Sequence, residues 1–139
     1  MIFLLDTNTF SYIAKGSSPA ARQEFQRHEE DRESRLCLSV ITEAEVRFGM
    51  AKHSLSASRK AAIEGLLAHF EILPWGSAEA AVYAEERARL EAQGITLATM
   101  NLLIAAQAIA AGATLVSNDS IFRKTKGLWT IENWTMDVF

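Results

Sequence analysis

Four side chains with oxygen donors stand at places in this sequence where chemistry could be done: Asp6, Glu45, Asn101 and Asp119. Three of them follow short apolar runs, and Asn101 begins an apolar helical segment. Carboxylates that lie close together repel one another, which raises their pKa values unless a cation neutralises them. The sequence has no His or Cys set at zinc spacing, so an oxygen site of this kind suits Mg²⁺ or Mn²⁺. Such an ion could position and activate a water for attack on a phosphodiester.

The first two of these residues also have a purely structural explanation. Asp6 or Asn8 would cap a helix that starts near Thr9, a role that contributes about 1 kcal/mol. Thr42 and Glu45 have the T-x-x-E spacing of a capping box, in which the glutamate reaches back to the backbone amide of the threonine. For Glu45 taken alone, the capping box is the better explanation.

Asp119 and Asn101 have structural alternatives as well. Asp119 stands in SND, an ordinary turn sequence, and Asn101 would suit the N-cap or the first turn of the apolar helix. The joint placement favours chemistry, because capping does not require all four residues to gather at one edge of a sheet. In parallel sheets, ligands bind beyond the carboxyl ends of the strands, which is where these residues would lie.

The segments that must position this set alternate between strand and helix patterns. Apolar runs predict parallel strands at residues 2–5, 36–41, around Ile72 and at 114–116, and LWTIENW (128–134) predicts an edge strand. Spacing and capping residues predict helices from Pro19 to about Glu30, from near Ser56 or Ser58, from Ser77 to Gly94, and from Asn101 to Ala111. Such alternation predicts an α/β fold with helices on both faces of a mainly parallel sheet.

Length and composition are typical of one globular domain. A chain of 139 residues with 49% hydrophobic residues can bury a core of its own, so we expect residues 1–139 to form a single domain. The one cysteine, Cys37, lies in an apolar run and predicts a buried free thiol. The first residues lack the features of an export signal, and the apolar stretch from Leu102 is too short for a membrane span. We therefore expect a cytoplasmic protein with no membrane partner.

The net charge of -3 gives no global attraction for nucleic acid, so RNA binding would depend on local basic residues or on metal ions. The candidates for phosphate contacts are Arg47 and the cluster of Arg123, Lys124 and Lys126. Three aromatic residues in apolar runs are expected to pack rather than stack on bases: Trp75, Trp129 and Trp134.

Four segments, in order, resemble PIN-domain proteins of the VapC toxin type: LLDTN (4–8), LSVITEAEVRFG (38–49), RARLEAQG…MNLLIAAQAIAAGATLVSND (87–119) and GLWTIENW (127–134). They span nearly the whole chain, and several motifs in register are more specific than any one of them. The resemblance implies a three-layer α/β/α sandwich with a central, mainly parallel sheet. It also implies a ribonuclease whose acidic cluster binds Mg²⁺ or Mn²⁺.

By this resemblance, the catalytic set would comprise Asp6, Glu45, Asn101 and Asp119, of which Asp6, Asn101 and Asp119 would hold the metal. Glu45 would be the second acidic residue of the set. Other residues would support the ligands, through hydrogen bonds to the first ligand or as the small hydroxyl before the last acidic residue. These supporting residues are Thr7 and Asn8, and Ser117.

The sequence departs from the family at position 101, where members usually carry Asp and this chain has Asn101. Asn keeps an oxygen that can coordinate weakly, but it removes a negative charge on which the affinity for a hard cation depends. We expect a weakened or inactive ribonuclease in this form. Two origins of Asn101 are consistent with the sequence: a naturally degenerate toxin, or an Asp-to-Asn substitution made so that a toxic protein could be produced in cells. The other residues of the set are intact, which favours the substitution.

Members of this family are usually homodimers, and their VapB-type antitoxins insert a C-terminal segment that blocks the acidic site. Phe10, Tyr12 and Ile13 are expected to form exposed apolar surface, which with residues 46–50 would contribute to the groove for that segment. The RNA substrate would be transfer RNA or ribosomal RNA, a choice that motifs do not encode.

Two other functions remain as alternatives. One is a catalytically degenerate PIN domain that only binds its antitoxin, for which Asn101 is the support. The other is a haloacid-dehalogenase-like phosphatase, which also begins with a strand followed by Asp. That class carries a second Asp two residues later, and Asn8 at this place counts against it.

Overall fold

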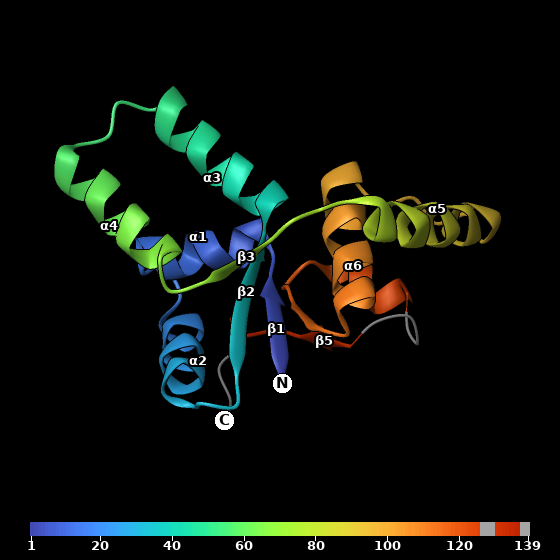
Figure 1. Ribbon diagram of the computed structural model, residues 1–139, viewed down its shortest axis with the longest axis horizontal. Coiled ribbons are helices and arrows are strands. Elements are labelled where there is room, and N and C mark those ends of the chain that lie inside the picture. Colours follow the sequence, from blue (N-terminus) through green and yellow to red (C-terminus); the bar gives the residue numbers. More distant parts are fainter. Residues whose placement is uncertain (126–129, 137–139) are drawn as a thin grey trace.

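The computed structural model describes residues 1–125 and 130–136, and strands and helices alternate along them (Figure 1). The strands are β1 (Ile2–Leu5), β2 (Arg35–Ser39), β3 (Glu71–Leu73), β4 (Thr114–Val116) and β5 (Ile131–Glu132). The helices are α1 (Thr7–Lys15), α2 (Pro19–Glu30), α3 (Val40–Lys52), α4 (Ala57–Leu67), α5 (Ser77–Ala92) and α6 (Thr99–Ala111). A short 3₁₀ helix, η1, covers Ser120–Thr125.

The strands form one parallel sheet in the order β3-β2-β1-β4-β5. β1 therefore lies at the centre, and Leu5 at its end is level with Leu38 of β2 and Val116 of β4. This register brings the residues that follow β1, β2 and β4 to the same edge of the sheet. The parallel sheet that the apolar runs predict is confirmed.

Alternate residues of the strands enter two separate cores, because successive side chains of a strand point to opposite faces. Leu5 and Leu38 lie in the core covered by α1, α2 and α4. Leu4, Cys37 and Leu115 lie in the core covered by α5 and α6. In Figure 1, α1, α2 and α4 are on one side of β1 and β2, and α5 and α6 are on the other. The predicted three-layer α/β/α arrangement is confirmed.

Several predicted boundaries differ in the structure, and two of these lie beside candidate site residues. The second strand was expected to reach Ile41, but β2 ends at Ser39 because the Ser39 hydroxyl accepts a hydrogen bond from the Ile41 amide at 3.1 Å and caps α3. The apolar helix was expected to begin at Asn101, but α6 begins at Thr99, with Ala98 as its N-cap and no side-chain cap. The Asn101 side chain is therefore not used in capping.

The expectation that Phe10 and Ile13 form exposed surface is wrong, since they are 1% and 2% exposed and belong to the core beneath α1. Trp134 is buried and Trp75 is half-buried with its Nε1 donating to Leu103 O at 3.0 Å, so the packing predicted for these two is confirmed. Trp129 lies outside the described residues. Within the described ranges, no helix is both long and apolar enough to cross a membrane.

Candidate functional site

The carboxyl ends of β1, β2 and β4 form an edge that carries oxygen-bearing side chains. Asp6 follows β1, Ser39 ends β2, and Ser117 follows β4, and all three are buried. The Asp6 amide donates to Val116 O at 3.0 Å, which joins the end of β1 to the end of β4. This edge is the place where the topology predicts a ligand site.

Asp6 is the N-cap of α1. Its Oδ1 accepts a hydrogen bond from the Thr9 amide at 2.8 Å, so the structural role that the sequence allows for Asp6 is present. Among the described residues, Asp6 Oδ2 has no hydrogen-bond partner. Yet the only fully buried side-chain nitrogen or oxygen without a partner in these residues is Gln107 Oε1. Although Asp6 is only 5% exposed, its Oδ2 is therefore not fully buried.

Glu45 faces α1 rather than the start of its own helix. The Thr7 hydroxyl donates to Glu45 Oε1 at 2.7 Å, and the hydroxyl oxygens of Thr7 and Thr42 are 3.2 Å apart. The capping box suggested for Thr42 and Glu45 is wrong, because Ser39 is the N-cap of α3 and Thr42 lies inside the helix. The packing of α1 against α3 thus places Glu45 beside the neighbour of Asp6.

Asn101 and Asp119 are in direct contact. Asn101 Nδ2 donates to Asp119 Oδ2 at 3.0 Å, although the two residues come from α6 and from the loop after β4. The other carboxylate oxygen, Oδ1, accepts from the Ile121 amide at 3.0 Å. The Asp119 amide donates to Ser117 Oγ at 3.1 Å, so the Ser117 hydroxyl stabilises the turn that presents Asp119.

The structure thus joins the expected residues in two pairs at one edge, Glu45 with Thr7 and Asn101 with Asp119. Asn8 is exposed in the first turn of α1. Among residues 1–125 and 130–136, no group of three or more His, Cys, Asp and Glu side chains lies close enough together to hold a metal ion. The donors at the edge are all oxygens, which fits Mg²⁺ or Mn²⁺ in ligand type, and the position that lacks a carboxylate is Asn101.

The basic residues proposed for RNA contacts differ in their surroundings. Arg47 forms ion pairs with Glu64 at 2.8 Å and with Glu43 at 3.2 Å. Hydrogen bonds to these two carboxylates raise the pKa of Arg47 above its ordinary value, and a phosphate would have to compete with both. Lys124 is exposed on η1, whereas the Arg123 side chain and all of Lys126 lie outside the described part of the chain.

A cavity of about 250 Å³ opens beside Glu45, between α1, α3 and α4. Val46, Met50 and Ile63 give it an apolar wall, and Lys15 and Arg59 add positive charge. Val46 and Met50 belong to the segment that the sequence suggests for a partner groove. An apolar segment bound in this cavity would lie directly against Glu45.

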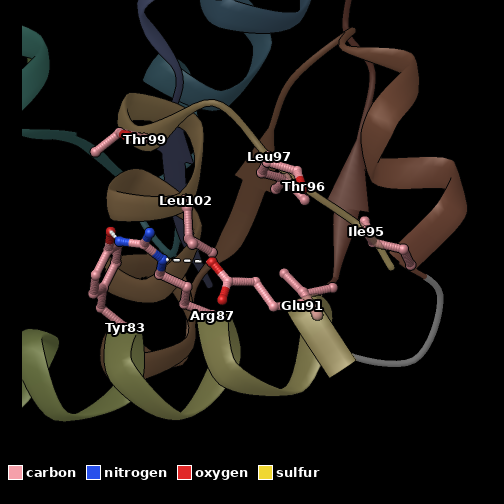
Figure 2. A pocket seen from close by; sticks show the side chains of 9 residues that line it. Tyr83, Arg87, Glu91, Ile95, Thr96, Leu97, Thr99 and Leu102 are labelled. Atoms are coloured by element: carbon pink, nitrogen blue, oxygen red, sulfur yellow. Dashed lines mark hydrogen bonds and ion pairs between the residues drawn. The ribbon is translucent and has the colours of Figure 1, made fainter. Parts of the chain in front are cut away.

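A smaller pocket of about 110 Å³ lies between α5 and the segment that leads into α6 (Figure 2). On its wall, Arg87 donates to Tyr83 Oη at 3.1 Å and to Glu91 Oε1 at 2.9 Å. The Arg87 guanidinium is therefore already partnered within α5. None of the four predicted site residues, Asp6, Glu45, Asn101 and Asp119, lines this pocket.

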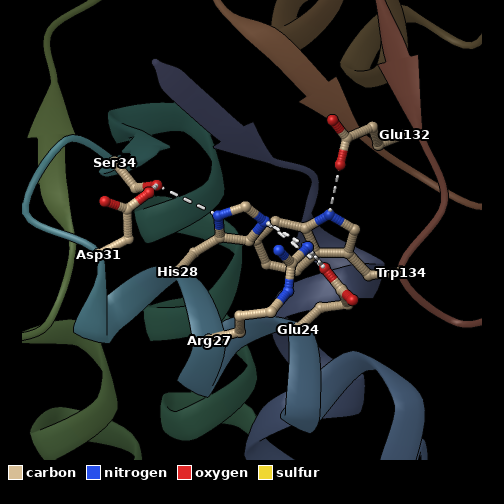
Figure 3. Close-up of polar contacts among 7 residues, drawn as sticks. All are labelled: Glu24, Arg27, His28, Asp31, Ser34, Glu132 and Trp134. Carbon is tan, nitrogen blue, oxygen red and sulfur yellow. Dashed lines mark hydrogen bonds and ion pairs between the residues drawn. The ribbon is translucent and has the colours of Figure 1, made fainter.

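A polar cluster on α2 has a structural role (Figure 3). The ring of His28 stacks on Trp134 with centroids 5.1 Å apart, and its Nδ1 lies 3.2 Å from Ser34 Oγ. Trp134 Nε1 donates to Glu132 Oε1 at 3.1 Å. These contacts attach the segment after β5 to α2.

Two contacts at the edge involve residues outside the set that the sequence predicts for the site. Thr42, for which the sequence predicts only a cap, contacts Thr7, and the Tyr12 hydroxyl accepts a hydrogen bond from Asn118 Nδ2 at 3.3 Å. A signal for Thr42 was present, since residues three apart in a helix share a face and Thr42 is three before Glu45. No spacing indicates the contact between Tyr12 and Asn118, which are 106 residues apart.

Comparison with known proteins gives one consistent result. Residues 3–128 match the family model described as PIN domain. The tRNA(fMet)-specific endonuclease VapC of Shigella flexneri is 28% identical over 134 residues, which cover 96% of this chain and 98% of the relative. Ribonuclease VapC2 of Haemophilus influenzae is 32% identical over 133 residues, which cover 95% of this chain and 97% of the relative. A chain of the crystal structure of VapBC2 from Rickettsia felis, bound to a DNA fragment from their promoter, has a TM-score of 0.86 at 28% identity, with 96% and 99% of the two chains covered.

Proposed function

This chain belongs to the PIN-domain family and to its VapC type, and on that basis we propose that it is a metal-dependent endoribonuclease, the toxin of a toxin-antitoxin pair. The observation that supports the proposal is that two contacts lie beside the carboxyl ends of β1 and β4, Thr7 with Glu45 next to Asp6, and Asn101 with Asp119. The family match favours this function over the phosphatase alternative.

In this proposal Asp6 and Asp119 hold Mg²⁺ or Mn²⁺, with a weak contribution from the Asn101 carbonyl oxygen. Asp6 suits this role because its cap to α1 uses Oδ1 and not Oδ2. When bound, the ion supplies positive charge next to the scissile phosphate and lowers the pKa of a water. The N-terminus of α1 adds a partial positive charge beside the Asp6 side chain that caps it.

The other residues orient the reactants. Glu45 accepts a proton from the attacking water through Oε2, since Oε1 is held by Thr7. Ser117 keeps the turn that presents Asp119, and Asn8 completes the supporting set from the first turn of α1. The proposed phosphate contacts are Arg123, Lys124 and Lys126, and Arg47 after release from its ion pairs.

The decisive test is Asn101→Asp. A carboxylate in place of an amide that lies 3.0 Å from Asp119 adds like charge that only a cation relieves, so metal affinity and cleavage should both rise. We expect Mn²⁺ to bind at least about tenfold more tightly by calorimetry, equivalent to about 1.4 kcal/mol. Cleavage of total RNA with Mg²⁺ or Mn²⁺ should be faster by at least about tenfold and should stop with a chelator.

Gln23→Glu provides a matched control, because it makes the same amide-to-carboxylate change on an exposed position of α2. This variant should leave Mn²⁺ affinity and cleavage unchanged. Equal metal affinities and equal rates for the chain and its Asn101→Asp variant would remove position 101 from the site. Absence of cleavage by both proteins with either metal would overturn the proposed nuclease.

We also propose a VapB-type antitoxin as partner, bound through the cavity between α1, α3 and α4. The apolar wall of Val46, Met50 and Ile63 suits an apolar peptide segment. A segment bound there would lie against Glu45 and would block access of RNA to the candidate site. The solved VapBC2 structure is that of a complex bound to promoter DNA, which supports a partner of this kind. A homodimer is part of the same proposal.

The RNA substrate proposed here is transfer RNA or ribosomal RNA, encountered in the cytoplasm. The name of the Shigella relative makes initiator transfer RNA the first substrate to assay. We further propose that residues 1–139 form one domain, since β5 lies beyond the matched residues 3–128 and still pairs with β4.

A binding-only function is the second candidate, and one contact favours it. The Asn101 amide donates to Asp119 Oδ2, so an internal hydrogen bond occupies an oxygen that a cation would use. In that case the protein would bind its antitoxin without cutting RNA. Failure of Mn²⁺ to bind to the unmodified chain, together with binding to the Asn101→Asp variant, is the outcome expected of this second function.

A further inference from the structure

Thr42 has a buried hydroxyl that neither capping nor the family motif explains. The residue is fully buried in the first turn of α3. The hydrogen-bond partner of its hydroxyl is the Thr7 hydroxyl, at 3.2 Å. A buried hydroxyl without a partner costs about 1–3 kcal/mol, so this contact accounts for the polar group.

The direction of the shorter hydrogen bond follows from the number of protons. Thr7 Oγ1 lies 2.7 Å from Glu45 Oε1 and 3.2 Å from Thr42 Oγ1, and a hydroxyl carries one proton. An ionised carboxylate only accepts, so the proton of Thr7 goes to Glu45 at the shorter distance. The Thr42 hydroxyl lies within hydrogen-bond distance of the same Thr7 oxygen. Because Thr42 is fully buried, water cannot replace this contact.

We propose that Thr42 is a positioning residue for Glu45, acting through a relay in which the Thr42 hydroxyl is bonded to the Thr7 hydroxyl and the Thr7 hydroxyl donates to Glu45. The contact with Thr42 holds the Thr7 hydroxyl in the orientation in which it donates to Glu45. The relay holds Oε1 and leaves Oε2 of Glu45 to act on the substrate. The catalytic consequence rests on the proposed ribonuclease function, but the relay itself does not.

A double-mutant cycle in urea unfolding tests the relay without any assay of activity. Thr42→Val should lower the unfolding midpoint of the unmodified chain, because the Thr7 hydroxyl loses a hydrogen-bond partner. Thr7→Val leaves the buried Thr42 hydroxyl without a partner, so adding Thr42→Val to Thr7→Val should raise the midpoint instead. A shift of the same sign and size in both backgrounds would overturn the relay.

Kinetics then test whether the relay positions Glu45. In both the unmodified chain and its Asn101→Asp variant, Thr42→Val should lower kcat for RNA cleavage by roughly 5- to 10-fold with little change in KM. Thr42→Ser keeps the hydroxyl and should restore most of the rate. Ser34→Ala serves as a control, since the half-buried Ser34 hydroxyl donates to Asp31 Oδ2 at 2.9 Å before the start of β2, at the other end of the strand from the candidate site, and its kcat should be unchanged.

The outcomes separate the two proposals. A reversal of sign in the cycle without RNA cleavage by any variant would support the relay and overturn the nuclease. Cleavage that is equally fast with Thr42→Val would overturn the positioning role of Thr42. An equally large loss of kcat in Thr42→Ser and in Thr42→Val would also overturn the positioning role, because the hydroxyl of residue 42 would then not be the group that affects the rate.

Discussion

At the scale of single residues, capping and ligand roles do not exclude one another. Asp6 Oδ1 accepts a hydrogen bond from the Thr9 amide, and Oδ2 is not used by the cap, so the same carboxylate can cap α1 and still bind a ligand. Glu45 and Asn101 behave differently, because neither caps its helix and each bonds to a side chain from another element. Capping is therefore present for Asp6 and absent for Glu45 and Asn101, although Asn101 does lie in the first turn of α6.

Cys37 is predicted to be chemically inert in the folded protein. Burial, with a contribution from the negative charge of Glu71, raises the pKa of its thiol to about 11 from an ordinary 9.0. At pH 8 the thiolate fraction is then about 100-fold lower than in the unfolded chain, and thiolate is the nucleophile. Alkylation by iodoacetamide, followed by mass spectrometry, should be at least about 100-fold slower in buffer than in urea.

The same pKa difference predicts a pH dependence of stability. Above pH 9.0 the unfolded chain loses the Cys37 proton, whereas the folded chain keeps it until about pH 11. The free energy of unfolding should therefore fall as the pH rises through this window. Cys37→Ala should lack this part of the fall, and identical pH profiles for the two proteins would contradict the assignment.

At the scale of elements, α6 connects the candidate site, through Asn101, to the segment between β3 and α5. Its residues 104–106 and 108 are buried, and Gln107 Nε2 donates to Pro74 O at 2.9 Å. Trp75 Nε1 donates to Leu103 O, so the connection between β3 and α5 is attached to this helix at two points. The attachment fixes the first turn of α6 and with it the position of Asn101.

Two glycines allow a matched test of how helices end. Gly112 terminates α6 with a φ of 63°, whereas Gly65 lies inside α4, and a Cβ at either position would meet no atom within 4 Å. Gly112→Ala should lower the free energy of unfolding by about 1 kcal/mol through backbone strain. Gly65→Ala should raise it by about 0.5–1 kcal/mol through helix propensity. Changes of the same sign in urea unfolding would contradict this account.

At the scale of the whole molecule, one sheet serves two cores. Leu4 and Leu5 are neighbours in β1, and they enter the cores on opposite faces. Neither layer of helices can therefore keep its core if the sheet separates. The acidic edge depends on the same strands, so loss of either core should also disperse the site.

This sharing predicts a single cooperative unfolding transition. Leu38→Ala in one core should cost about 2–5 kcal/mol, and Ile104→Val in the other about 0.5–1.5 kcal/mol. Each variant should shift the whole transition, observed by circular dichroism and by tryptophan fluorescence, with the two probes coincident. A variant that splits the transition into two steps would contradict one domain over residues 1–139.

Local patterns in the sequence were sufficient for the fold. Apolar runs located the strands, Ser18, Ser56 and Gly112 marked helix ends, and the alternation of elements implied the parallel sheet. These features depend on interactions between near neighbours in the chain, which spacing records directly. The arrival of Asp6 and Asp119 at one sheet edge follows from the same information, because each comes shortly after a parallel strand.

The tertiary structure decided which partner each polar side chain has. Glu45 bonds to Thr7 rather than to the amide of Thr42, and Asn101 bonds to Asp119 rather than capping α6. The partners are 38 and 18 residues apart, and they meet only because α1 packs against α3 and α6 lies beside the end of β4. No local spacing encodes such contacts, since a hydrogen bond between helices depends on how their faces pack.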